Sequence, residues 1–135
     1  MASDKQLVLK PQDLVVVLKI AVHPNRVFTL TELSGQLTMA LSAVHGSVTR
    51  GEQARLLSRS TGNMLAMRQS VREFVVYGAT YCFPGVLGQL ARGIPTGAAA
   101  PILSANFETL GPLAPVWADS NGDSYGPSLV PLHQT

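Results

Sequence analysis

The chain has 135 residues, of which 46% are hydrophobic and 13% are charged, so it can form a core but leaves much apolar surface to cover. Its formal net charge is +2, and its single cysteine, Cys82, excludes a disulfide within the chain, which is typical of a reducing compartment. The first residues lack the apolar stretch of a secretion signal. The longest apolar run, residues 14–22, is too short to span a membrane, so we expect a cytoplasmic protein.

The charge is divided unequally along the chain. Residues 1–69 carry eight Lys and Arg against four Asp and Glu, a net charge of +4. Residues 70–135 carry two Lys and Arg against four Asp and Glu, a net charge of −2. A basic half and an acidic half indicate two kinds of partner, and nucleic acid is a candidate for the basic half.

The first predicted elements are a short arm over residues 1–10 and a helix over residues 12–23. Pro11 and Asp13 are both favourable in the first turn of this helix, and Pro24 ends it. Apolar residues cover more than one side of the helix, which predicts a central position or a subunit interface.

A second helix is predicted from the pattern Thr29-Leu-Thr-Glu32, in which a capping box would let Thr29 and Glu32 satisfy each other's backbone donors. This helix should end soon after Leu37, because Ser42 is a typical N-cap for a third helix. That third segment, residues 42–53, is unusual: it contains two glycines, small polar residues and a histidine, all poor helix formers.

The remaining elements are a hairpin, one more helix and a long terminal segment. The turn residues 60–63, Ser-Thr-Gly-Asn, predict a small hairpin within residues 55–65. A helix over residues 64–80 should bury one face and end before Pro84, with Cys82 as a small buried apolar residue. That face is Met64, Met67, Val71, Phe74, Val75 and Gly78. Residues 85–135 are expected to form an extended Pro/Gly-rich segment packed on the domain or on a partner subunit.

Residues 28–63, "FTLTELSGQLTMALSAVHGSVTRGEQARLLSRSTGN", resemble the DNA-binding half of the bacterial winged helix-turn-helix regulators, the MarR-like group in particular. The resemblance implies a mainly α fold over residues 1–84, with a β-hairpin wing, that binds duplex DNA as a homodimer and acts as a transcriptional regulator, a repressor. Two positions depart from the pattern: Ser34 stands where Ala is usual, and Thr38 stands where Gly is usual.

The helical wheel gives residues 42–53 two different sides. At about 100° per residue, Val44, Val48 and Gly51 fall on one anchoring edge, and small or hydrogen-bonding residues fan around the other. Such a face fits the major groove, where a small residue such as Gly46 lets the backbone approach and Arg50 can pair with guanine or phosphate. The residues expected to contact DNA are Thr29, Thr31, Ser42, Ala43, His45, Gly46, Thr49, Arg50, Gln53, Arg59 and Ser60.

Two other interpretations stay open. The polar face can be an ordinary solvated surface, or the chain can be a protein-interaction module, for instance an antitoxin-like neutralising partner, that keeps the winged-helix shape and binds through residues 85–135. The sequence shows no phosphate loop, no paired catalytic carboxylates and no cluster of metal ligands, so we expect neither enzymatic activity nor a cofactor.

Overall fold

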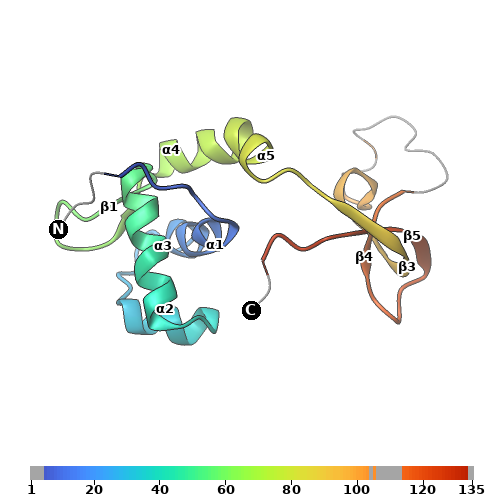
Figure 1. The fold of residues 1–135 in the computed structure, drawn as a ribbon, viewed down its shortest axis with the longest axis horizontal. Helices are drawn as coiled ribbons and strands as arrows, with labels where there is room; N and C mark the ends of the chain where they lie inside the picture. The colour runs from blue at the N-terminus through green and yellow to red at the C-terminus, as the bar shows by residue number, and fades with distance from the viewer. Residues whose placement is uncertain (1–4, 104, 106–113, 134–135) are drawn as a thin grey trace. The chain divides into compact units, whose positions relative to one another are not determined.

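The computed structural model describes residues 5–103, 105 and 114–133 (Figure 1). The chain divides into two compact units: residues 1–84 with 132–135, here the helical unit, and residues 85–131, here the β unit. None of the described helices has the length and apolar character needed to cross a membrane.

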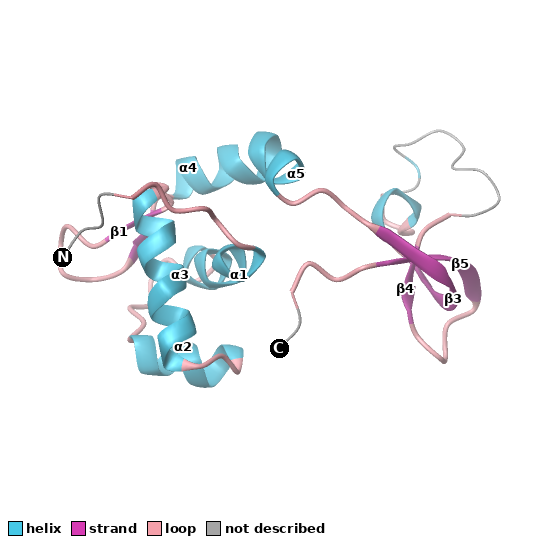
Figure 2. Cartoon of the chain, viewed as in Figure 1, coloured by secondary structure: helices cyan, strands magenta, loops and turns pink. Residues whose placement is uncertain are grey.

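The helical unit combines short helices with one two-stranded hairpin (Figure 2). Its elements in chain order are α1 (Pro11–Ala21), α2 (Leu30–Leu37), α3 (Leu41–Gln53), β1 (Leu57–Ser58), β2 (Leu65–Ala66), α4 (Arg68–Glu73), the π-helical turn η1 (Phe74–Gly78) and α5 (Ala79–Cys82).

The two ends of α1 are held by side chains as well as by its own backbone. Pro11 occupies the first turn, as predicted, and the Asp13 carboxylate accepts a hydrogen bond of 2.7 Å from the backbone N–H of Lys10. At the other end, the Arg68 guanidinium donates to the carbonyl of Ala21. A cation at the C-terminus of a helix is favourable because the terminal carbonyls have no partner within the helix.

Helix α2 starts with half of the predicted capping box. The Thr29 Oγ1 accepts a hydrogen bond of 3.1 Å from the backbone N–H of Glu32, so Thr29 is the N-cap. The reciprocal bond is replaced by an ion pair, because the Glu32 carboxylate lies 3.4 Å from the Arg26 guanidinium.

The connection between α2 and α3 accounts for both departures from the helix-turn-helix pattern. Thr38 has φ +55°, the left-handed conformation that usually favours glycine. The Ser34 hydroxyl donates a hydrogen bond of 2.5 Å to the carbonyl of Met39 and so closes the same turn. The predicted N-cap, Ser42, is wrong: Ala40 is the N-cap and α3 begins at Leu41, because the left-handed Thr38 turns the chain into the helix earlier.

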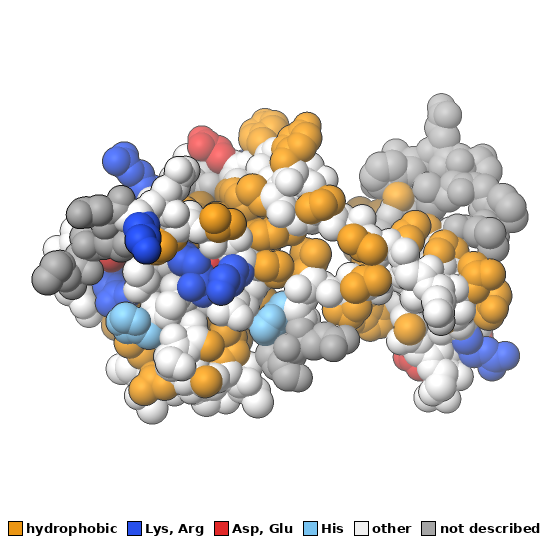
Figure 3. All heavy atoms as spheres, viewed as in Figure 1, with side chains coloured by type: hydrophobic (Ala, Val, Ile, Leu, Met, Phe, Trp, Pro, Cys, Tyr) orange, Lys and Arg blue, Asp and Glu red, His pale blue; other side chains and the backbone are white. Residues whose placement is uncertain are grey.

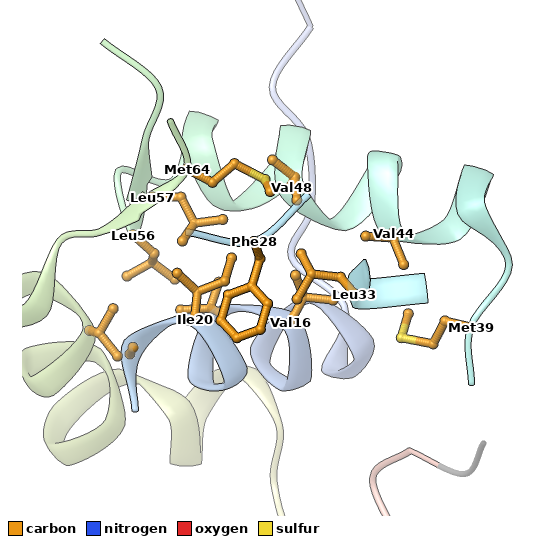
Figure 4. Close-up of a cluster of buried hydrophobic side chains, with 13 residues drawn as sticks. Val16, Ile20, Phe28, Leu33, Met39, Val44, Val48, Leu56, Leu57 and Met64 are labelled. Carbon is orange, nitrogen blue, oxygen red and sulfur yellow. The ribbon is translucent and has the colours of Figure 1, made fainter. Parts of the chain in front are cut away.

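The core of the helical unit lies between α1, α2, α3 and the hairpin (Figure 4). Val16, Leu33 and Val48 are among the fully buried side chains and point toward one another from three helices. Gly51 lies where a Cβ would come within 3.1 Å of Leu57 and 3.2 Å of Val17, so the absence of a side chain lets α3 pack closely.

The hairpin forms as predicted, but the following helix starts later than predicted. In the β1–β2 ladder Leu57 faces Ala66, and Gly62 turns the chain with φ +89°. The helix predicted over residues 64–80 begins at Arg68 instead, because the strand β2 uses the residues before it. After Val71 no residue of α4, η1 or α5 is buried, and Cys82 and most apolar residues there are exposed; the burial predicted for Cys82 is wrong.

The β unit contradicts the prediction of an extended segment lying on a surface. Its elements are β3 (Leu87–Pro95), the short 3-10 helix η2 (Gly97–Ala99), β4 (Val116–Ala118) and β5 (Ser124–Leu129). Strand β3 pairs antiparallel with both β4 and β5, and a parallel pairing of Val116 with Ser128 closes the three strands on one another. Residues 85–131 therefore form a small closed sheet of their own and not an extended segment.

The interior of the β unit is filled by backbone and small residues. A Cβ added at Gly93 would collide with the backbone carbonyl of Trp117, and one added at Gly126 would collide with the carbonyl of Ala114. Among the described residues of this unit, Val116 is the one apolar side chain that is buried, with 1% exposed. Three closed strands leave almost no interior space, because even eight-stranded barrels are only just filled by side chains.

We expect Gly93→Ala to unfold the β unit selectively, because the added methyl group meets rigid backbone and not a movable side chain. The loss should exceed about 2 kcal/mol of unfolding free energy. Thermal melting followed by the fluorescence of Trp117, the only tryptophan, reports the β unit, and circular dichroism reports the helices. Gly85→Ala is the control, because a Cβ there makes only an ordinary 3.8 Å contact with Leu129. Equal melting of Gly93→Ala and Gly85→Ala would contradict this packing.

Candidate nucleic-acid interface

Helix α3 has one buried side and one accessible side, as the helical wheel predicted. Val44 and Val48 are fully buried in the core. On the accessible side Ser42 and His45 are exposed, and Thr49 is half-buried with its hydroxyl donating to the carbonyl of His45 at 3.0 Å. These three residues form the outer face of α3. Ala43, also predicted to contact DNA, packs partly against the core.

Arg50 is committed to a contact that the sequence did not predict. Its Nε and Nη2 donate to the two carboxylate oxygens of Asp13 at 2.7 and 2.9 Å, a bidentate ion pair between α3 and α1. The Asp13 side chain is fully buried and that of Arg50 is 16% exposed. The two charge-assisted hydrogen bonds hold the Arg50 side chain in place. Removing Arg50 would leave the buried Asp13 carboxylate without its cation. The sequence predicted that Arg50 pairs with guanine or phosphate; the structure shows its Nε and Nη2 engaged in the ion pair with Asp13.

The same ion pair explains Gly46. A Cβ at this position would lie 3.2 Å from Nη1 of Arg50, so the glycine makes room for the guanidinium as it reaches Asp13. The predicted reason, close approach of the helix backbone to DNA, is replaced by an intramolecular one.

Gln53 also has an intramolecular role. Its amide accepts from the backbone N–H of Leu7 at 2.6 Å and donates to the carbonyl of Lys5 at 2.8 Å, which attaches the N-terminal arm to α3. Both polar atoms of the Gln53 side chain thus have intramolecular partners, and its contact with DNA stays a prediction.

The hairpin brings cations next to the C-terminal end of α3. The Arg59 guanidinium lies 3.6 Å from the carboxylate of Glu52, and about a third of the Arg59 side chain is exposed. Ser60 is exposed beside it, with its hydroxyl 3.1 Å from that of Ser58. Arg55, which the sequence reasoning missed, is exposed directly after α3 with φ +64°. In the sequence, the sign of this cation is an arginine placed two residues after the predicted end of the helix at residue 53.

Thr29 and Thr31 lie exposed at the start of α2, as predicted from the capping pattern. Thr29 uses its hydroxyl oxygen as the N-cap, so its remaining capacity is as a donor. Thr31 follows in the first turn of the helix, where backbone N–H groups favour an anion.

The helical unit is the basic part of the chain. Residues 1–84 carry nine Lys and Arg against five Asp and Glu, a net charge of +4, whereas residues 85–135 carry one against three, a net charge of −2. In the view of Figure 3 most blue Lys and Arg side chains gather over the helical unit. The unit that contains α3 therefore carries the excess positive charge of the chain.

Within the described residues, no three His, Cys, Asp or Glu side chains come together in a way that could hold a metal ion. Comparison of the chain with models of known protein families, with curated proteins and with solved structures finds no match. The function is therefore inferred from the geometry of the chain itself.

We expect Arg50→Ala to lower the free energy of unfolding by about 3–5 kcal/mol, because the Asp13 carboxylate stays buried without its partner. The double variant Asp13→Asn/Arg50→Ala should lose less than the sum of the two single changes, since no unpaired charge remains. Urea unfolding followed by circular dichroism gives these values, with Gln36→Ala, an exposed change on α2, as the control. A loss below about 1 kcal/mol in Arg50→Ala would show that the pair is not a structural support.

Proposed function

We propose that the chain is a winged helix-turn-helix protein of the cytoplasm that binds double-stranded DNA as a homodimer and regulates transcription as a repressor. The observation that carries this proposal is the division of α3. Val44 and Val48 anchor one side in the core, and the other side presents the small polar residues Ser42, His45 and Thr49. An outer face of this kind fits the major groove, which admits a helix and offers hydrogen-bonding base edges.

The surroundings of α3 support the same assignment. Arg55 and Arg59 stand at its C-terminal end, where the hairpin begins, and are suited to phosphate contacts. Thr31 at the start of α2 and Ser60 in the hairpin supply hydroxyl groups of the kind that bind phosphate oxygens. In this arrangement α3 reads bases, and the cations position it on the backbone.

We assign the homodimer surface to the C-terminal end of α1, to α4 and to η1. A hollow of about 330 Å³ there is mostly apolar and is rimmed by Arg68 and Arg72. Its exposed apolar side chains include Val22, 66% exposed, and Val76, 57% exposed. A second copy on this surface would cover it, and a symmetric dimer would recognise a near-palindromic site.

Binding to the DNA upstream of its own gene, against unrelated DNA of equal length, tests the assignment. We expect the double variant Ser42→Ala/His45→Ala to bind the specific DNA roughly 10–100-fold more weakly, with little change on unrelated DNA, because base contacts are lost. Arg55→Ala should weaken binding to both DNAs and reduce the dependence on salt by about one counterion. Thr80→Ala, an exposed change on α5, is the control. Weak binding to both DNAs that none of these variants alters would refute the proposal.

The oligomeric state tests the dimer surface. We expect the wild-type chain to be a dimer in analytical ultracentrifugation and Val22→Glu/Val76→Glu to be a monomer, because two carboxylates would lose their water in an apolar contact. Val27→Glu is the matched control, since Val27 is 52% exposed and lies outside the hollow. A dimer that persists in the double variant would exclude this surface.

A second candidate function is a protein-interaction module, such as an antitoxin-like neutralising partner. It is favoured by one observation: the acidic β unit carries large apolar side chains on its outside. Under this function the full chain would bind a protein through the β unit, and substitutions on the outer face of α3 would leave that binding unchanged.

A further inference from the structure

The β unit carries its large apolar side chains on its outer surface. Along β3, residues 90, 92 and 94 alternate onto one face, and the ladder gives each a neighbour on the adjacent strand. The pairs are Leu90 with Pro127, Arg92 with Tyr125, and Ile94 with Trp117. We call Leu90, Arg92, Ile94, Trp117 and Tyr125 the β stripe.

Every member of the β stripe is exposed. Tyr125 is 63% exposed, Leu90 51%, Ile94 49% and Trp117 47%. Trp, Tyr and Arg are the residue types that contribute most to protein interfaces, and here they are adjacent on one sheet face. The 47 residues from 85 to 131 bury a single described apolar side chain, Val116, so this small unit gains little stability from its own core.

The area of the β stripe limits what can cover it. From the exposed fractions, the four apolar side chains offer roughly 450 Å² per copy, or about 900 Å² for two copies, slightly below the about 1,000 Å² of a specific interface between free proteins. A contact of this area forms a stable interface only between surfaces that are already held together. Two β units linked by a dimer of helical units meet this condition, because the second contact is then effectively intramolecular.

Charge also favours a second copy. Arg92 lies exposed in the middle of the stripe, and no ion pair joins it to an acid among the described residues. An exposed carboxylate is close by in the same unit: Asp123 precedes Ser124, which faces Gly93, the neighbour of Arg92. In a two-fold contact each copy supplies both groups, so one cation and one acid on the same surface complement themselves.

We propose that the β stripe packs against the β stripe of a second copy about a two-fold axis, with Arg92 of each copy against Asp123 of the other. The inference rests on the homodimer of the proposed function, which brings the two β units together. It adds a second contact to that dimer and assigns a role to the acidic half of the chain.

Disulfide trapping in the full chain tests this contact. In a Cys82→Ser background, Tyr125→Cys carries one cysteine, so any disulfide that forms joins two chains. We expect it to crosslink under mild oxidation at least about tenfold faster than Gln89→Cys, an exposed control on β3 next to Leu90. Adding Arg92→Glu should slow the crosslinking about tenfold, and adding Asp123→Arg to that variant should restore it.

The outcomes separate this inference from the proposed function. If the chain is a dimer and binds its DNA but Tyr125→Cys crosslinks no faster than Gln89→Cys, the β-stripe contact is wrong and the proposed function stands. If the chain is a monomer at the concentrations used, the homodimer fails and this inference fails with it. Fast crosslinking of Tyr125→Cys that Arg92→Glu slows and that the further change Asp123→Arg restores supports the contact.

Discussion

The buried ion pair between Asp13 and Arg50 determines much of the helical unit. Asp13 accepts three hydrogen bonds, one from the backbone of Lys10 and two from Arg50, and its side chain is fully buried. Burying a carboxylate is costly unless its lone pairs are used and its charge is matched. The pair therefore fixes the first turn of α1 against the last turn of α3, and a Cβ at Gly46 would lie only 3.2 Å from Nη1 of the same guanidinium. Two segments far apart in the sequence, the first turn of α1 and the stretch of α3 from Gly46 to Arg50, thus depend on one interaction.

The accessible face of α3 is therefore narrower than the helical wheel predicts. Arg50 pairs with Asp13 of α1 and Gln53 bonds to the N-terminal arm, so both side chains already have intramolecular partners. Ser42, His45 and Thr49 remain, with cations only at the C-terminal end of the helix. Short neutral side chains give modest affinity for one half-site, because phosphate contacts supply much of the binding free energy. A DNA-binding function therefore depends strongly on Arg55, Arg59 and the second copy.

Local patterns predicted the local elements, and their failures have physical reasons. Pro11, the Thr29 cap and the Gly62 turn each act within a few residues, so the helices and the hairpin could be predicted from the sequence. The partner of Arg50 lies 37 residues away, and no pattern in one sequence links such positions. Met67 fits a helical period but donates its backbone N–H to the carbonyl of Leu56, and this long-range pairing overrides the periodicity.

The β unit was missed because its pattern is the reverse of the usual one. Strands are recognised by apolar residues that alternate toward a core, but in a closed set of three strands the interior accepts only glycine and Val116. The large apolar residues must then point outward, and a sequence rich in Gly, Ala and Pro with scattered apolar residues has the composition of an extended segment. Residues 85–135 carry one Arg against three acids, a net charge of −2, so this segment offers little positive charge to attract the phosphates of DNA. The closed strands leave the large apolar side chains on the outside, and the charge of this segment does not favour nucleic acid. We therefore expect a protein to cover this surface.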